Sequence, residues 1–347
     1  MKQPFVYIIL SLLFFSSCQE EKISIGTKDS DTFYVENQGA SMRVLVEGNT
    51  VSKTFLLIVH GGPGSNSFIY NTDYISQHLE DNYAVVYWDQ RNAGASQGNA
   101  NGDDLTLSTM TTDLKKVIQV IKYRYGQNIN LFLLGHSFGG LLTSSFLTKD
   151  DNQSMVKGWI FADGSHNYPL NDTLTRQMLL TVGEQEVASG RNVSKWNPII
   201  SYCQAHTGNF TFDESMQLES YASTAETYFP EVKQFDLWSL IKQNAIKENW
   251  PLSSIGLNYL YSSNADLNKV LAKTSFSNLL NRINIPTLVL VGKRDFVCPK
   301  ELADDLYNRI GSLDKKESVS DISGHNMFIQ DEAFFCTEIS SFIELHK

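Results

Sequence analysis

Short apolar runs alternate with helical patterns along most of this chain. Continuously apolar runs, which are typical of strands buried on both faces of a sheet, occur at 55–59, 84–88, 131–134, 159–162 and 287–291. Three further stretches are strand-like, namely a leading antiparallel pair at 33–35 and 42–46 and a weaker, edge-like strand at 316–320.

Helical periodicity fills the spaces between these strands. One apolar stripe repeats at three- and four-residue steps and consists of Met110, Leu114, Val117, Ile118, Ile121 and Tyr125. Similar stripes follow residue 137 and occupy 334–342. Repeated strand–helix–strand units imply a mostly parallel sheet covered on both faces, so we predict an α/β fold with eight strands.

Residues 165–282 interrupt that rhythm. They are rich in Tyr, Trp, Asn and Glu and contain helical patches but no convincing buried strand. Because the segment lies between two predicted sheet strands, we expect a mainly helical cap inserted after the sixth strand.

Composition limits the classes of function that the chain can serve. A length of 347 residues with 42 % apolar side chains is ample for a large buried core. The formal net charge of −10 argues against a nucleic-acid-binding surface, which would need a basic face.

The amino terminus resembles an export signal. Lys2 is followed by an apolar stretch at 5–15, which is too short to span a bilayer as a helix, and then by Ser16, Ser17 and Cys18. The pattern resembles a bacterial lipoprotein signal, which predicts a signal peptide at 1–17, lipidation of Cys18, a polar tether at 18–30 and attachment to the cell envelope. The alternative is an ordinary signal peptide with an incidental cysteine. The other three cysteines are widely spaced, form no metal-ligand pattern and are expected to be small buried side chains.

A nucleophile motif follows the apolar run at 131–134. Gly135-His136-Ser137-Phe138-Gly139 stands between that strand and a helical pattern, which is the setting that a Gly-x-Ser-x-Gly elbow requires. The turn projects the serine hydroxyl above the sheet, and Ser137 is therefore the predicted nucleophile.

The serine needs a base and an acid, which in this architecture follow it in the order acid, then histidine. Gly292-Lys-Arg-Asp295 ends the strand at 287–291, and Ser323-Gly324-His325 lies just past the last strand. Of the seven histidines, His325 alone has both the right order and a loop at the carboxyl edge of the sheet. We expect Asp295 to orient it, with Asp163, after the strand at 159–162, as the alternative acid.

Two further loops follow strands. His-Gly-Gly-Pro-Gly at 60–64 should supply one oxyanion-hole donor, which we assign to Gly62, while the backbone N–H of Phe138 supplies the other. The loop at 88–96 begins Trp-Asp-Gln-Arg, and we expect Asp89 and Arg91 to pair as a scaffold.

Together these motifs resemble the proline iminopeptidase group of α/β-hydrolases. The resemblance rests on HGGPG at 60–64, WDQR-x-x-G-x-S at 88–96, and the Gly-x-Ser-x-Gly, Gly-x-x-Asp and Gly-His motifs. It covers residues 31–164 and 283–347, the predicted catalytic domain. The chain departs from the group in having GHSFG, common in esterases, where the group usually has GGSWG, and WDQRN where it has WDQRG.

The resemblance implies a serine aminopeptidase that removes an amino-terminal residue, such as proline, from short peptides, with no metal or organic cofactor. Candidates for the cap carboxylates that would hold the substrate's amino group are Glu184, Glu186, Glu226 and Glu231, although the favoured interpretation of each is a solvated helix charge. The same machinery could serve an esterase, lactonase or amidase. A lipid-anchored binding protein without catalysis is a third reading.

Overall fold

The computed structural model describes residues 29–98, 102–234, 236 and 265–347. The predicted signal peptide, Cys18 and part of the predicted cap lie outside these residues, so the expectations about them stay predictions. None of the helices in the described ranges is long and apolar enough to cross a membrane.

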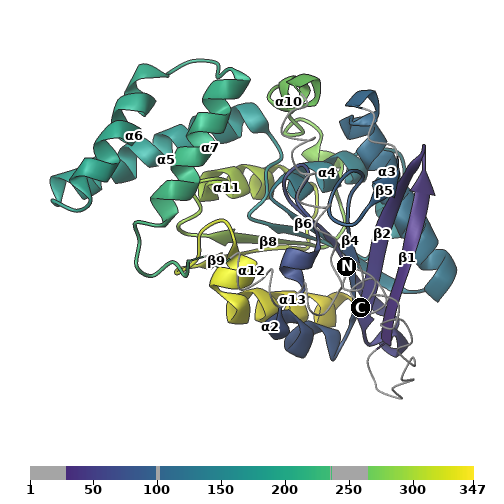
Figure 1. Ribbon diagram of the computed structural model, residues 1–347. Helices are drawn as coiled ribbons and strands as arrows, with labels where there is room; N and C mark the ends of the chain where they lie inside the picture. The colour runs from purple at the N-terminus through teal and green to yellow at the C-terminus, as the bar shows by residue number, and fades with distance from the viewer. Residues whose placement is uncertain (1–28, 99–101, 235, 237–264) are drawn as a thin grey trace, which may run out of the picture.

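A single twisted sheet forms the centre of the molecule (Figure 1). Its strands are β1 (Asp29–Asn37), β2 (Ala40–Gly48), β3 (Thr54–Val59), β4 (Ala84–Trp88), β5 (Gln97–Gly98), β6 (Asn130–His136), β7 (Gly158–Ala162), β8 (Thr287–Gly292) and β9 (Lys315–Ser320). The order across the sheet is β1-β2-β4-β3-β6-β7-β8-β9, and β5 pairs with β2. β2 runs antiparallel to β1 and β4, while the strands from β4 to β9 in this order are parallel.

The predicted mostly parallel sheet and its leading antiparallel pair are confirmed. The sheet has nine strands instead of the predicted eight, because the two-residue β5 pairs with the start of β2. Two exposed residues carry no hydrophobic pattern, so nothing in the sequence indicates this strand. β1 also begins at Asp29, within the segment predicted to be a tether.

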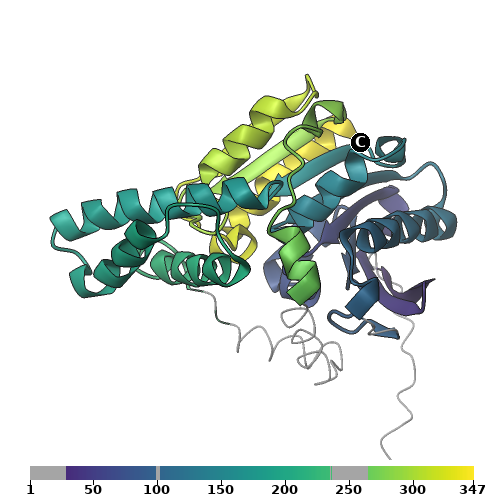
Figure 2. The same ribbon diagram turned by 90° about the horizontal axis from the view of Figure 1, so that it is seen from above.

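Helices cover both faces of the sheet, as Figures 1 and 2 show. The α-helices are α2 (Asp73–Ile75), α3 (Leu107–Tyr125), α4 (Phe138–Leu147), α5 (Tyr168–Ala188), α6 (Val193–Ala205), α7 (Phe212–Glu226), α10 (Ala265–Leu271), α11 (Lys300–Arg309), α12 (Met327–Gln330) and α13 (Glu332–His346). Side chains of α3, α4 and α11 share one core with the sheet, whereas α2, α12 and α13 share a second core on the opposite face. Strands β3, β4, β6, β7 and β8 are buried almost throughout, because a parallel sheet between two helical layers has no solvent face.

Between β7 and β8 the described chain is mainly helical, as predicted. Helices α5, α6 and α7 project to one side of the sheet (Figure 2). Their own core includes Leu179, Trp196 and Leu218, and it continues into Phe296 and Val297 of the loop after β8. The helices of this cap therefore pack directly against the loop that carries Asp295.

The loop at 88–96 is a scaffold, but with different partners from those predicted. Arg91 is fully buried, and its guanidinium donates to both carboxylate oxygens of Asp113 on α3, at 2.5 and 2.7 Å. Asp89 instead accepts hydrogen bonds from the backbone and hydroxyl of Ser67 and from the N–H of Ala95. The expected pairing of Asp89 with Arg91 is wrong, because the arginine extends to α3 and bonds there.

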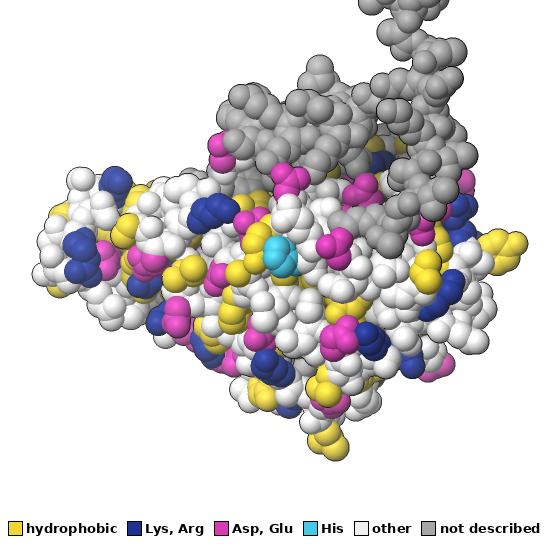
Figure 3. Space-filling model, turned by 90° about the horizontal axis from the view of Figure 1, so that it is seen from below, with side chains coloured by type: hydrophobic (Ala, Val, Ile, Leu, Met, Phe, Trp, Pro, Cys, Tyr) yellow, Lys and Arg dark blue, Asp and Glu magenta, His cyan; other side chains and the backbone are white. Residues whose placement is uncertain are grey.

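The visible part of one face of the molecule carries mixed charge. On the face shown in Figure 3, acidic and basic side chains are interspersed and hydrophobic ones are scattered. The cysteines Cys203, Cys298 and Cys336 are free and buried, as their spacing indicates.

Candidate active site

Ser137 lies in the sharp turn between β6 and α4. Its backbone has a φ of 56°, in the left-handed region that is unusual for a residue with a side chain. The turn fits only because its neighbours are small: a β-carbon at Gly135 would come within 2.5 Å of the Gly139 carbonyl. The Ser137 N–H donates to the carbonyl of Asp163, which ties the elbow to the end of β7.

Three side chains predicted from separate parts of the chain meet at the carboxyl edge of the sheet. His325 Nε2 lies 3.0 Å from Ser137 Oγ, and His325 Nδ1 lies 3.0 Å from Asp295 Oδ2. The other oxygen of Asp295 accepts hydrogen bonds from the N–H groups of Val297 and Cys298, at 2.9 and 2.7 Å. The Asp295 side chain is therefore completely enclosed and held in one orientation.

Burial controls the charge of the histidine. It lowers the pKa of His325 to about 4, while the negative charge of Glu219 acts in the opposite direction. The imidazole is consequently neutral at neutral pH and has a lone pair on Nε2 for the serine proton, provided that Nδ1 carries its proton toward Asp295.

The loop at 60–64 lies over Ser137. A β-carbon on Gly61 would come within 2.9 Å of the Ser137 β-carbon, so only glycine allows this approach. Gly62 has a φ of 118° and, with Pro63 and Phe138, lines the same cavity as Ser137. The two predicted oxyanion-hole residues thus flank the serine from different elements.

His136, which lies between Gly135 and Ser137, connects this loop to His325. The Tyr70 hydroxyl accepts from the Gly61 N–H at 3.4 Å and lies 2.7 Å from His136 Nδ1, and His136 Nε2 lies 2.8 Å from the carbonyl of His325. Burial lowers the pKa of His136 to about 3, so the ring is neutral. In one protonation state that satisfies both contacts, the Tyr70 hydroxyl donates to His136 Nδ1, and the N–H at His136 Nε2 donates to the His325 carbonyl. His136 then joins the backbone of the loop at 60–64 to that of His325.

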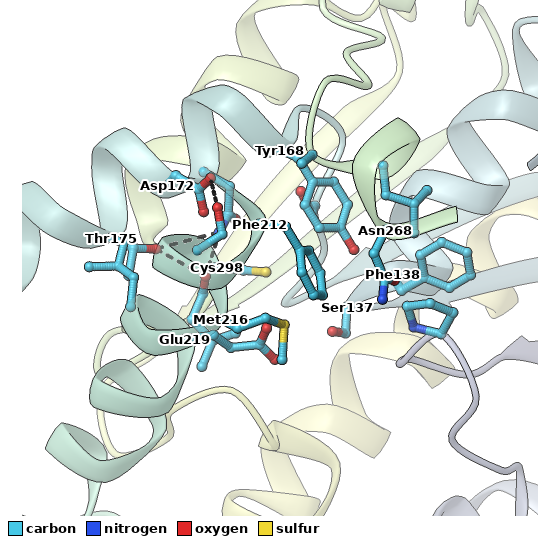
Figure 4. Close-up of a pocket in the computed structure, with 18 of the residues that line it drawn as sticks. Ser137, Phe138, Tyr168, Asp172, Thr175, Phe212, Met216, Glu219, Asn268 and Cys298 are labelled. Carbon is cyan, nitrogen blue, oxygen red and sulfur yellow. Dashed lines mark hydrogen bonds between the residues drawn. The ribbon is translucent and has the colours of Figure 1, made fainter. Parts of the chain in front are cut away.

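A cavity of about 240 Å³ opens beside Ser137, between the sheet edge and the cap helices (Figure 4). Apolar groups make up most of its wall, including Tyr168, Phe212 and Met216. Two carboxyl groups also border it, Asp172 of α5 and Glu219 of α7. Burial raises the pKa of Asp172 to about 6, although a hydrogen bond from Ser215 opposes the shift.

None of the four cap carboxylates considered from the sequence lines this cavity. Glu186 pairs with Arg191 and Glu231 with Arg294, while Glu184 is exposed. Glu226 is buried, contrary to the reading of it as a solvated helix charge. The carboxyl groups that do border the cavity belong to Asp172 and Glu219. The sequence does not indicate them, because nothing in the helical pattern of α5 or α7 shows which side chain faces Ser137.

Glu226 joins the cap to both loops that flank the histidine. Its carboxylate accepts from the N–H of His325 at 3.1 and 3.2 Å and from the N–H of Phe296 at 3.3 Å. A β-carbon at Gly324 would overlap this carboxylate, so the glycine before His325 allows the contact.

The arrangement does not favour a metal ion. Ligand atoms of Asp295, Cys298 and His325 lie within 4.8 Å of one another. However, Asp295 and His325 already bond to each other, and a metal would have to replace that hydrogen bond.

Comparisons with known proteins point to hydrolases. A family model described as serine aminopeptidase, S33, matches residues 51–185. A Bacillus subtilis (strain 168) protein named "Probable aminopeptidase YbaC" is 22 % identical over 310 residues, covering 87 % of this chain and 93 % of that protein.

Solved structures share the fold at low identity. A proline iminopeptidase-related protein from Thermus thermophilus has a TM-score of 0.62 at 17 % identity, covering 92 % of this chain and 98 % of that one. An esterase from Exiguobacterium antarcticum has a TM-score of 0.57 at 21 % identity, covering 90 % of this chain and 100 % of that one.

Proposed function

We propose that this chain, an α/β-hydrolase of the proline iminopeptidase-like type, is a serine aminopeptidase that releases amino-terminal residues from short peptides. The observation that carries the proposal is the continuous pair of 3.0 Å contacts from Ser137 through His325 to Asp295 at the wall of a cavity. Removing any one of the three would break the path by which the serine loses its proton.

In the proposed reaction, Ser137 Oγ attacks the carbonyl carbon of the scissile amide while His325 Nε2 accepts the hydroxyl proton. Asp295 holds the ring and stabilises its cationic form. Backbone N–H groups of Phe138 and Gly62 stabilise the negative oxygen of the tetrahedral intermediate, and each such donor is worth about 3 kcal/mol. His325 then protonates the leaving amine, and water hydrolyses the acyl-enzyme by the same route.

The cavity wall supports a substrate with a free amino group. A protonated amine next to an apolar side chain matches a cavity that is mainly apolar but bordered by Glu219 and Asp172. A carboxylate bonded to a cation contributes about 1.5–3 kcal/mol, enough to favour free amines over acylated ones by tenfold or more. The small volume suits one residue rather than a long chain.

A substrate panel tests this proposal. Prolyl and alanyl arylamides, their N-acetylated forms and short p-nitrophenyl esters would be compared with wild type and Glu219→Gln, which keeps the shape of the side chain and removes its charge. We expect hydrolysis of the free-amine arylamides alone among the amides, and a KM at least about tenfold higher for them in Glu219→Gln. Ester hydrolysis should change little.

The alternative is an esterase with the same nucleophile. The Gly-His-Ser-Phe-Gly elbow and the structural likeness to the Exiguobacterium antarcticum esterase favour it. Efficient ester cleavage with no turnover of any free-amine arylamide would refute the aminopeptidase proposal and support this one.

We also propose export and lipid attachment through Cys18, on the sequence pattern alone. Radiolabelled palmitate fed to expressing bacteria should label the wild-type chain but not Cys18→Ser. Equal labelling of the two would refute the anchor.

A further inference from the structure

A second aspartate lies against the proposed triad. Asp163 follows β7 and Asp295 follows the neighbouring β8, so the parallel pairing of these strands brings the two carboxyl groups to the same edge of the sheet. Both side chains are at most 1 % exposed. The two carboxyl groups lie close enough for each to affect the ionisation of the other.

The contacts of Asp163 leave one of its oxygens without a donor. Oδ1 accepts from the N–H of Gly292 at 2.7 Å. Oδ2 is buried, and within the described part of the chain no N–H or hydroxyl donates to it. Two carboxylates offer only acceptors, so a hydrogen bond between Asp163 and Asp295 requires one of them to hold a proton.

The surrounding donors decide which carboxyl group is neutral. Asp295 accepts from two backbone N–H groups and faces the imidazole of His325. Burial raises the pKa of both carboxyl groups well above the ordinary value, so only one of the two is readily ionised. Because Asp295 has two N–H donors and the imidazole while Asp163 has the N–H of Gly292 and an Oδ2 without a donor, the negative charge of the pair resides on Asp295.

Other titratable groups also lie near Asp163. They are Tyr70 of the 3₁₀ turn at 68–70, Glu226 at the end of α7, and Cys298 in the loop after β8. Glu226 is a further carboxyl group and adds repulsion. Neither Asp163 nor Glu226 forms an ion pair with a lysine or arginine among the described residues.

We propose that Asp163 is a neutral carboxylic acid whose hydroxyl donates a hydrogen bond to Asp295, which makes it a positioning residue for the triad. The inference rests on the proposed role of Ser137, His325 and Asp295. The extra donor fixes the carboxylate that holds the imidazole, and because Asp163 is uncharged, it adds no second negative charge beside His325.

Two substitutions distinguish a neutral hydrogen-bond donor at position 163 from a negative charge there. Asp163→Asn can still accept from Gly292 and donate from its amide to Asp295, and asparagine tolerates the φ of 42° at this position. Asp163→Ala removes both bonds. The readout is the second-order rate of labelling by a fluorophosphonate across pH, because it needs the serine and its base but no particular substrate.

We expect labelling of Asp163→Ala to be slower than wild type by roughly tenfold to a hundredfold. Asp163→Asn should recover most of that loss. In a plot of its labelling rate against pH, the midpoint of the fall in rate toward acidic pH should match the wild-type midpoint. An ionised Asp163 predicts otherwise: removing its charge would move the midpoint to lower pH by about one unit or more. Such a shift, or equal rates for the two variants, would overturn the inference. Wild-type protein that is not labelled at all would instead refute the proposed function.

A measurement on the unsubstituted protein covers the case in which the variants fail to fold. Infrared spectra of protein with isotope-labelled aspartate, taken at pH 8, should contain the carbonyl band of a protonated aspartic acid. Asp172, whose pKa is raised to about 6, is ionised at that pH. Absence of the band would overturn the inference.

Discussion

Removing the Glu226 carboxylate should weaken both the fold and the proposed catalysis. In Glu226→Ala, the N–H groups of His325 and Phe296 lose their acceptor. An unsatisfied buried N–H costs about 1–3 kcal/mol, so the free energy of unfolding should fall by roughly 2–6 kcal/mol. That is a large part of the ~5–15 kcal/mol that stabilises a typical domain.

The same change should lower the rate of reaction. The carboxylate holds the backbone of His325 directly, and a displacement of about 1 Å in a catalytic group costs on the order of 100-fold. Glu226→Gln, which keeps one oxygen acceptor, should lose roughly 1–2 kcal/mol. Urea unfolding gives the stability, and hydrolysis of the best substrate in the panel gives kcat/KM.

Glu184→Ala is the matched control, because it removes an exposed carboxylate from another helix of the same cap. Its unfolding free energy should stay within about 0.5 kcal/mol of wild type. If Glu226→Ala behaved like this control in both stability and kcat/KM, the reasoning about a carboxylate that joins cap and catalytic loops would be refuted.

Two other perturbations have outcomes that the structure fixes. Arg91→Ala leaves the buried Asp113 without its cation, although the Asn37 amide still donates to it, and should cost about 3–5 kcal/mol in urea unfolding. A loss under about 1 kcal/mol would contradict the burial of this ion pair. Burial raises the pKa of Asp172 to about 6, so the protonated side chain contributes fully to stability below about pH 4. As the pH rises from about 4 to about 6, the free energy of unfolding should fall by at most about 3 kcal/mol. Asp172→Asn should flatten that part of the pH–stability curve, and an unchanged curve would show that the carboxyl group titrates normally.

The core of the fold was predictable because its signals are local. Each buried strand of the parallel sheet is a continuous apolar run such as 55–59, and the elbow at 135–139 carries its glycines next to the serine. These features depend on residues adjacent in the chain. The spatial meeting of Ser137, Asp295 and His325 follows from strand order, because the loops in question all leave the same edge of a parallel sheet.

The missed features depend on partners that are distant in sequence. Glu226 resembles any helix charge until the loop at 324–325, about 100 residues later, is packed against it. Arg91 is expected to pair with Asp89 in the same loop, whereas its partner in the structure, Asp113, lies on α3. Which cap carboxylate faces the cavity likewise depends on how α5 and α7 pack on the sheet. Local patterns contain no information about that packing.

Mapping a covalent adduct tests the central claim most directly. A fluorophosphonate probe would be added to native protein, and the modified residue located by peptide mass spectrometry. Our account predicts one adduct, on Ser137, that is absent from Ser137→Ala and forms much more slowly in His325→Ala. Full labelling of Ser137→Ala, or hydrolytic activity that survives that substitution, would contradict it.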